Sequence, residues 1–286
     1  MRAGPLLAAA LLALACHAGA ALARNQLGSR DAVVVDPQKS YIFYRTDQRL
    51  PLRLLREVSP AQRTAWELER ARGLERARRA YPGRLREWQR LQAECRGSQA
   101  PACLNRDTER PVEPTEANFT IPPPELDNFL DISAGPQFTR DGEDYTYLMT
   151  VDPGSYIVYG QIVVTSQAGG TGICLCMGSV RFEAPAGRIV DLGELRYPIA
   201  EALAAGQTVN PGISPLTSHA IVPATDAMAR PDRLAGLPVV PAEFRAADKM
   251  PNYFGVQISR LAAMPGVLGY ERDRVIDLRT GQPVAP

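Results

Sequence analysis

Cysteine is the residue type whose number and spacing say most about chemistry in this chain of 286 residues. Four cysteines follow the N-terminal apolar segment, and an even number in an exported protein favours disulfides. The four disulfide candidates are Cys95, Cys103, Cys174 and Cys176. Cys95 and Cys103 flank a short loop that can fold back on itself. Cys174 and Cys176 can pair only through a bulge or turn, because side chains two apart in an extended strand stay too far from one another.

Two buried thiols, or bridges to other partners, fit the Cys174-x-Cys176 sequence equally well. The pair could also bind Cu(I) through two thiolates or exchange disulfides. In a single strand over 173–184, both cysteines would share one face with Val180 and Phe182. We expect that apolar face to lie in the core, and burial opposes reactive thiols. A thiol- or copper-handling function is therefore the less favoured alternative.

Histidine is nearly absent, since the chain holds only two and one of them precedes the expected mature protein. Because His219 would be the only histidine of the mature protein, sites that need two His ligands are excluded. Ser214 or Ser218 beside His219 and an acid could hydrolyse a substrate, but the G-x-S-x-G turn is missing. The sequence therefore indicates no catalytic residue, no metal site and no cofactor. A cleft with two carboxylates, or the Ser–His pairing, would favour a hydrolase, whereas a flat apolar patch would favour binding.

Residues 1–23 have the pattern of a secretory signal peptide. Arg2 is followed by an apolar run over 6–15 and by small residues with Ala-x-Ala cleavage patterns. We expect a periplasmic or extracellular protein of a bacterial envelope, the bacterial source being inferred from the Ala, Arg and Pro bias. Acylation of Cys16 would instead make it a lipoprotein, although the residues before Cys16 fit a lipobox poorly. Outside the cytoplasm, we expect no nucleic-acid partner.

Residues 59–96 are predicted to form a helical hairpin. Ser59 to Gln62 has the spacing of a capping box with proline at the first helical position. Good helix formers follow, and Pro82-Gly83 should break the helix into two. The stretch from Arg53 to Arg96 holds 12 Arg and 6 Glu. This surplus could suit an anionic lipid or polymer, or simply form a solvated, ion-paired face.

Alternating and β-branched segments predict a sheet-rich protein. The expected strands are 32–35, 41–44, 50–55, 145–151, 155–165, 173–184 and 188–195. Residues 97–140 form a polar, Pro-rich connection. Residues 197–286 are a Pro-rich wrap with two strands, at 253–258 and 274–278, and a loose tail over 280–286.

Three segments carry a resemblance to a known group of proteins. They are Asp152-Pro-Gly-Ser-Tyr156, Val180-Arg-Phe-Glu-Ala-Pro-Ala-Gly187 and Ile189-Val-Asp-Leu-Gly193. Together they resemble a pattern in uncharacterised exported bacterial proteins that carry small prealbumin-like β-sandwiches. The resemblance covers about 50 residues. It implies a sandwich module of the kind found in lipoproteins and envelope proteins, and it transfers no catalytic residue.

These observations predict an α+β fold. An antiparallel β-sandwich is built from residues 24–58 and 141–196, with the helical hairpin inserted and an irregular Pro-rich C-terminal region. The expected function is a non-enzymatic structural, assembly or binding role in the cell envelope, with an envelope protein or polymer as partner. Membrane association could arise through Cys16 or the Arg-rich helices. The alternative is an envelope hydrolase with a site built from loops.

Overall fold

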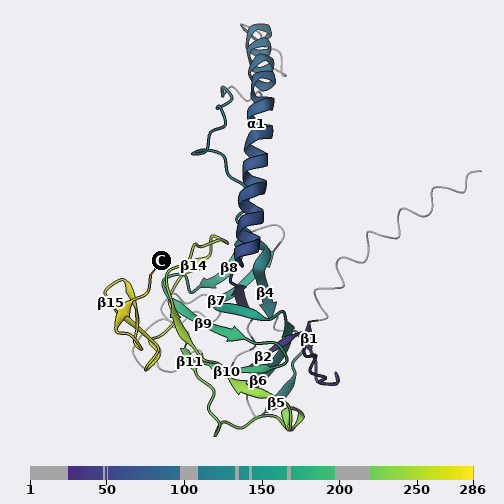
Figure 1. Cartoon of the computed structure of the whole chain (residues 1–286), viewed down its shortest axis with the longest axis vertical. Coiled ribbons are helices and arrows are strands. Elements are labelled where there is room, and N and C mark those ends of the chain that lie inside the picture. The colour runs from purple at the N-terminus through teal and green to yellow at the C-terminus, as the bar shows by residue number, and fades with distance from the viewer. Residues whose placement is uncertain are drawn as a thin grey trace, which may run out of the picture. The chain divides into compact units, whose positions relative to one another are not determined.

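The computed structural model describes residues 25–47, 49, 51–96, 109–132, 135–141, 144–165, 169–196 and 220–285. The chain forms two compact units, drawn in Figure 1. The sandwich unit contains Met1–Glu57 and Phe129–Pro286, and the helical unit contains Val58–Asn128. The predicted insertion is therefore present and continues beyond residue 96.

Two seven-stranded sheets form the sandwich unit. The first sheet contains β1 (Gln26–Leu27), β2 (Ser40–Thr46), β5 (Thr139–Asp141), β6 (Asp144–Val151), β10 (Ile189–Arg196), β11 (Ala220–Val222) and β12 (Val239–Pro241). The second contains β3 (Leu52–Arg56), β4 (Phe129–Ile132), β7 (Gly154–Thr165), β8 (Gly169–Cys174), β9 (Ser179–Ala184), β13 (Arg245–Ala247) and β14 (Gln257–Ile258). These sheets confirm the predicted α+β class and most of the predicted long strands.

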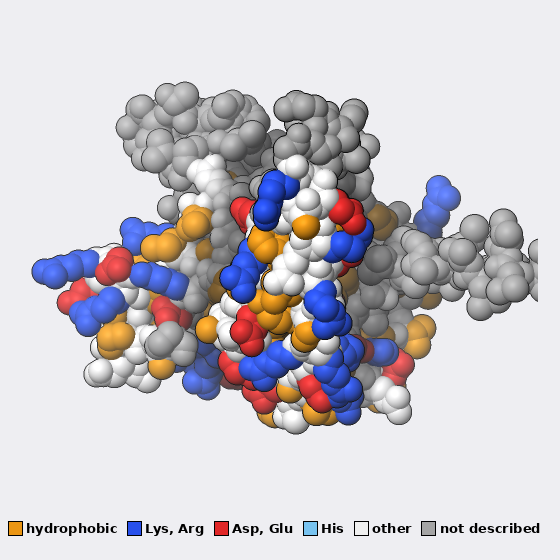
Figure 2. All heavy atoms as spheres, turned by 90° about the horizontal axis from the view of Figure 1, so that it is seen from above, with side chains coloured by type: hydrophobic (Ala, Val, Ile, Leu, Met, Phe, Trp, Pro, Cys, Tyr) orange, Lys and Arg blue, Asp and Glu red, His pale blue; other side chains and the backbone are white. Residues whose placement is uncertain are grey.

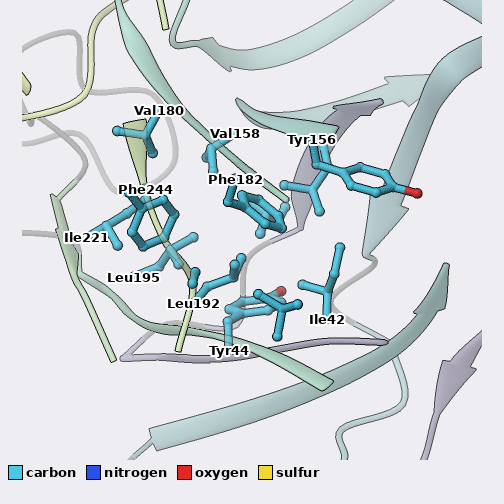
Figure 3. Close-up of a cluster of buried hydrophobic side chains, with 14 of the residues drawn as sticks. Ile42, Tyr44, Tyr156, Val158, Val180, Phe182, Leu192, Leu195, Ile221 and Phe244 are labelled. Atoms are coloured by element: carbon cyan, nitrogen blue, oxygen red, sulfur yellow. The ribbon is translucent and has the colours of Figure 1, made fainter. Parts of the chain in front are cut away.

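The largest apolar cluster joins side chains of both sheets. Figure 3 shows Ile42 and Tyr44 of the first sheet facing Val158 and Phe182 of the second. Phe182 also meets the ring of Phe244 edge-on, with the ring centroids 5.9 Å apart. This packing of two sheet faces, each contributing alternate residues, is the architecture of a β-sandwich.

The outer face of each sheet is also covered. Tyr41 and Phe43 of β2 belong to a second cluster with Leu234, the last residue of the short 3₁₀ helix η3 (Asp232–Leu234). All seven residues of β2 are consequently buried, so this strand shows no apolar–polar alternation. The predicted strand over 32–35 is wrong: Val33 and Val35 pack on this outer face without pairing to a strand.

The sandwich is not purely antiparallel. β10 pairs in parallel with β2 and with β12, and β8 pairs in parallel with β14. A parallel pair needs a long crossover connection. Between β2 and β10 the chain passes through the second sheet and the whole helical unit, which supplies that length. The remaining strand pairs of the two sheets are antiparallel.

The C-terminal region contains more strand than the sequence predicts. Besides β11 to β14, a third sheet is formed by β15 (Leu268–Glu271), β16 (Arg274–Asp277) and β17 (Gln282–Pro283). The strand predicted at 274–278 is confirmed, and the loose tail is wrong because β17 pairs with β16. Strands of two to four residues are too short to show a period, so only tertiary pairing defines them.

The helical hairpin is replaced by one continuous helix, α1 (Pro60–Glu94). Its predicted capping box is confirmed, since the Ser59 hydroxyl accepts from the Gln62 amide and the Gln62 side chain accepts from the Ser59 amide. Pro82 lies inside the helix. Pro82 and Gly83 are both exposed, so water can satisfy the carbonyl that loses its partner, and strong helix formers continue on each side.

Part of the predicted Pro-rich connection returns along the helix. The Trp66 indole donates to the carbonyl of Pro122 at 2.7 Å, and Arg70 donates to the carbonyl of Phe119 at 3.2 Å. The Phe119 ring lies against Gly73, where a Cβ would be only 2.9 Å from it. The 3₁₀ helix η2 (Pro124–Asn128) ends this unit, and the predicted connection over 97–140 also contains β4 and β5.

A buried ion pair joins β2 to β10. The Asp191 carboxylate is fully buried and lies 2.9 Å from Arg45, whose side chain is 9% exposed. Asp191 also accepts from Arg230 Nε at 3.2 Å and from the backbone amide of Gly193 at 3.0 Å. Four hydrogen bonds thus satisfy both carboxylate oxygens.

We predict that Asp191→Asn lowers the free energy of unfolding by about 3–5 kcal/mol, because it leaves the Arg45 charge buried without its counter-ion. Urea unfolding at neutral pH measures the loss. Asp152→Asn is the control: Asp152 pairs with Lys39 at 2.8 Å, but its side chain is 54% exposed. Its loss should not exceed about 1 kcal/mol. Equal losses for the two variants would contradict a special role for the buried pair.

We predict that Pro82→Ala stabilises the continuous helix by up to about 3 kcal/mol, since proline is that much less favourable than alanine inside a helix. Amide hydrogen exchange across residues 78–90 measures the gain. Gly83→Ala, where nothing lies within 4 Å of a new Cβ, should add about 1 kcal/mol. Unprotected amides just after Pro82 in the wild-type chain would instead support a hairpin.

Candidate functional site

Cys174 and Cys176 are joined by a disulfide, with their Cα atoms 5.1 Å apart. β8 ends at Cys174, and a turn follows in which the Gly178 amide donates to the carbonyl of Leu175 at 3.3 Å. The predicted need for a turn is therefore met. Gly178 has a φ of +134° and lies against Tyr270 and Val275, so a larger residue fits neither the backbone nor the space.

This turn corrects the prediction that the cysteines share a face with Val180 and Phe182. The expected strand over 173–184 is two strands, β8 and β9, and the alternation of faces does not continue through the turn between them. Cys174 and Cys176 belong to the cluster on the outer face of the second sheet. Val180 and Phe182 belong to the cluster between the sheets. The cysteines are buried as predicted, at 0% and 2% exposure, but on the opposite face.

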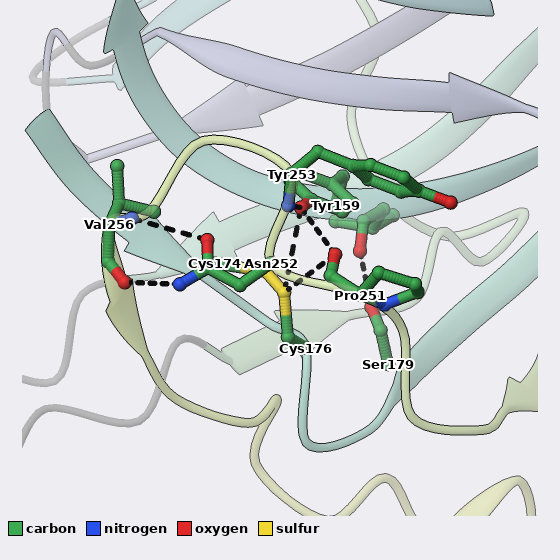
Figure 4. Close-up of a disulfide and its surroundings, with 9 residues drawn as sticks. Tyr159, Cys174, Cys176, Ser179, Pro251, Asn252, Tyr253 and Val256 are labelled. Carbon is green, nitrogen blue, oxygen red and sulfur yellow. Dashed lines mark hydrogen bonds between the residues drawn. A yellow bond between two sulfur atoms is a disulfide. The ribbon is translucent and has the colours of Figure 1, made fainter. Parts of the chain in front are cut away.

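A loop over residues 250–256 lies over the disulfide, as Figure 4 shows. The Tyr159 hydroxyl donates to the carbonyl of Pro251 at 2.8 Å and accepts from the amide of Tyr253 at 3.0 Å. Cys176 Sγ lies 3.6 Å from that hydroxyl oxygen. Burial raises the pKa of Tyr159, which keeps its hydroxyl protonated as a donor. Tyr159 of β7 thus holds the loop to the second sheet, directly beside the disulfide.

Aromatic rings pack around Tyr159 and the loop that covers the disulfide. The ring of Phe129 meets those of Tyr159 and Phe254 edge-on, with centroids 4.7 and 4.8 Å apart. The guanidinium of Arg53 lies over the Phe254 ring at 4.3 Å and pairs with Asp131. Packing of this kind excludes reagents from the sulfur atoms, so the geometry is that of a structural disulfide.

The other residues that the sequence suggested are mostly outside the described part of the chain. Cys95 takes part in a disulfide. Cys103 and Cys16 are not among the described residues, so the Cys95–Cys103 bridge and the acylation of Cys16 remain predictions. The segment 197–219, with Ser214, Ser218 and His219, is also outside them. A Ser–His site is therefore neither supported nor opposed.

A hollow of about 310 Å³ opens beside β9, where the chain crosses from one sheet to the other. β12 pairs with β10 in the first sheet, and β13 pairs with β9 in the second. The connecting residues are fixed on the way, because the Ala242 amide donates to the carbonyl of Asp191 at 2.8 Å and Phe244 is buried. We call this site the Arg–Glu hollow; it is lined by Arg181, Phe182, Glu183, Pro185, Val240, Pro241, Glu243 and Arg245.

Four charged side chains give the Arg–Glu hollow its character. Arg245 of β13 lies directly opposite Arg181 of β9. Glu183 is two residues beyond Arg181, and Glu243 is two residues before Arg245. Arg181 pairs with Glu57 at 3.1 Å, whereas Glu183, Glu243 and Arg245 have no ion pair within the described residues. Sequence reasoning missed this site, because its residues are about 60 positions apart and meet only through strand register.

Within the described residues, no three His, Cys, Asp or Glu side chains gather closely enough to hold a metal ion. No helix in that part of the chain combines the length and the apolar character needed to cross a membrane. No protein-family model, curated protein or solved structure matches this chain. The prealbumin-like resemblance thus stays a prediction from the residues that carry it.

We predict that Cys174→Ser with Cys176→Ser lowers the free energy of unfolding by about 2 kcal/mol, the chain-entropy value for so short a loop. Differential scanning calorimetry measures the change. We also expect the native wild-type disulfide to resist reductant and alkylating reagent until the protein unfolds, as followed by intact mass. Rapid reduction in the native state, with stability unchanged in the double variant, would instead revive the thiol or copper function.

Proposed function

We propose that this chain is an exported, non-enzymatic binding protein of the bacterial cell envelope, and that the Arg–Glu hollow holds an envelope polymer. The observation that carries the proposal is the hollow itself. Paired strands present charges of both signs around it, and Pro185, Val240 and Pro241 supply apolar surface. A concave site with a few fixed polar groups on an apolar base is the usual form of a ligand site.

Export is supported by the cysteines. Cys174 and Cys176 form a disulfide, and Cys95 is also disulfide-bonded. Disulfides persist in oxidising compartments such as the periplasm and are rare in the bacterial cytosol. Together with the signal-peptide pattern of residues 1–23, this favours a periplasmic or extracellular location.

The helical unit would offer a second contact with an anionic partner. Figure 2 shows a face on which basic and acidic side chains are interspersed. Along α1, Arg76 pairs with Glu69 at 2.7 Å. Arg72, Arg84 and Arg86 are exposed and form no ion pair within the described residues. This surplus favours an acidic envelope polymer or an anionic membrane surface over a neutral one.

A hydrolase is the second candidate, because Glu183 and Glu243 line the same hollow. Paired carboxylates can act as general acid and general base on a glycosidic bond. Both side chains are exposed, however, whereas a carboxylic acid that donates a proton near neutral pH is usually buried. Binding therefore fits the hollow better than hydrolysis.

Co-sedimentation of the purified mature chain with insoluble cell-wall polymer tests the proposal. We expect the wild-type chain to pellet with the polymer, and the double variant Glu183→Gln with Glu243→Gln to bind about tenfold more weakly, through loss of charge-assisted hydrogen bonds. Asp226→Asn and Arg188→Gln, which change exposed charges outside both the hollow and α1, are the matched controls and should bind normally.

The supernatant of the same experiment separates the two candidates. Soluble polymer fragments that appear with the wild-type chain, and disappear with either single glutamate variant, would establish the hydrolase instead. Failure of the wild-type chain to pellet, or equal pelleting of the hollow and control variants, would overturn binding at the Arg–Glu hollow.

A further inference from the structure

We infer that the Arg–Glu hollow recognises a zwitterionic end group, namely a free ammonium and a free carboxylate about one dipeptide apart. The inference rests on the proposed function, because it assigns the ligand chemistry of the same site. It is carried by the four charges that line the hollow and by the strand register that sets two of them opposite each other.

The register places like charges opposite one another. Arg181 and Arg245 are direct cross-strand partners, as are Val180 with Ala246 and Ser179 with Ala247. Glu183 is two residues beyond Arg181 and Glu243 is two residues before Arg245, and both glutamates line the same hollow. One end of the site therefore carries two guanidinium groups, and the other end carries two carboxylates.

Such an arrangement is unfavourable without a ligand. Like charges directly opposite each other on an antiparallel pair are destabilising. Glu57 offsets the charge of Arg181, but no ion pair within the described residues offsets that of Glu183, Glu243 or Arg245. A ligand carboxylate at the arginine end and a ligand ammonium at the glutamate end would satisfy both pairs at once.

The spacing of the charges selects the ligand. Residues two apart on a strand are separated by about 6.6–6.8 Å, so the Cα atoms of Arg181 and Glu183 at the two ends are this far apart. A dipeptide spans at most about 7 Å between its termini. Pro185, Val240 and Pro241 give the hollow apolar surface, which favours small apolar side chains in a cavity of about 310 Å³.

Isothermal titration with three probes tests the inference: alanyl-alanine, its N-acetyl form and its C-terminal amide. The full-length mature chain should bind alanyl-alanine at least about tenfold more tightly than either blocked form, because each block removes one charge-assisted contact. Raised salt should weaken binding of the zwitterion. Equal affinity for all three probes would overturn the inference.

Two single variants test which end binds which group. Arg245→Gln should lose the discrimination against the amide and keep that against the N-acetyl form. Glu243→Gln should show the reverse, and Arg188→Gln and Glu67→Gln should behave as the wild type. All four positions are exposed, so none of these changes should unfold the chain.

The result also separates this inference from the function on which it rests. If the chain pellets with the polymer in a way that depends on the hollow, but alanyl-alanine does not bind, then recognition of a zwitterionic end group is overturned. The proposed binding function then remains. Absence of both would overturn the two together. Binding of alanyl-alanine without discrimination by the Arg245 and Glu243 variants would place the peptide elsewhere and overturn the inference.

Discussion

The buried contact between Arg45 and Asp191 organises the first sheet and everything attached to it. Asp191 is fully buried and immediately precedes the irregularity where the β2–β10 register shifts. Its side chain accepts from the amide of Gly193, which has a φ of +85°. A Cβ at Gly193 would be 2.1 Å from the carbonyl of Val222, so β11 can approach only a glycine here. The backbone carbonyl of Asp191 also receives the Ala242 amide, and this fixes the crossing beside the Arg–Glu hollow.

Burial of both faces of each sheet explains why the irregular segments matter. The Pro-rich chain after residue 220 has little regular structure of its own, but it covers the outer faces of both sheets. It supplies Leu234 over the first sheet and Val256 over the second. Proline carbonyls take part directly, since the Ile189 amide donates to Pro238 and the Met250–Tyr253 segment is held through Pro251. A residue without an amide hydrogen can accept from a sheet while avoiding an unpaired donor of its own.

Local patterns in the sequence predicted elements well and contacts poorly. The capping Ser59 and the strands near 41–44 and 155–165 were predictable, because their signals lie within a few residues. The continuity of the helix through Pro82 was not predictable, since a proline's cost depends on whether water reaches the freed carbonyl. The Arg–Glu hollow could not be predicted at all. Arg181 and Arg245 belong to separate strands, and no local pattern states the register that places them together.

The disulfide and the Arg–Glu hollow are connected through β9. The strand begins at Ser179, directly after the turn closed by Cys174 and Cys176, and the Ser179 hydroxyl donates to the carbonyl of Val158 at 2.5 Å. Because β9 begins at Ser179, its side chains alternate between the two faces so that Phe182 points into the core and Glu183 is exposed. A slip of one residue would exchange the two faces of the strand. The buried disulfide therefore helps to hold the register that presents the charges of the Arg–Glu hollow.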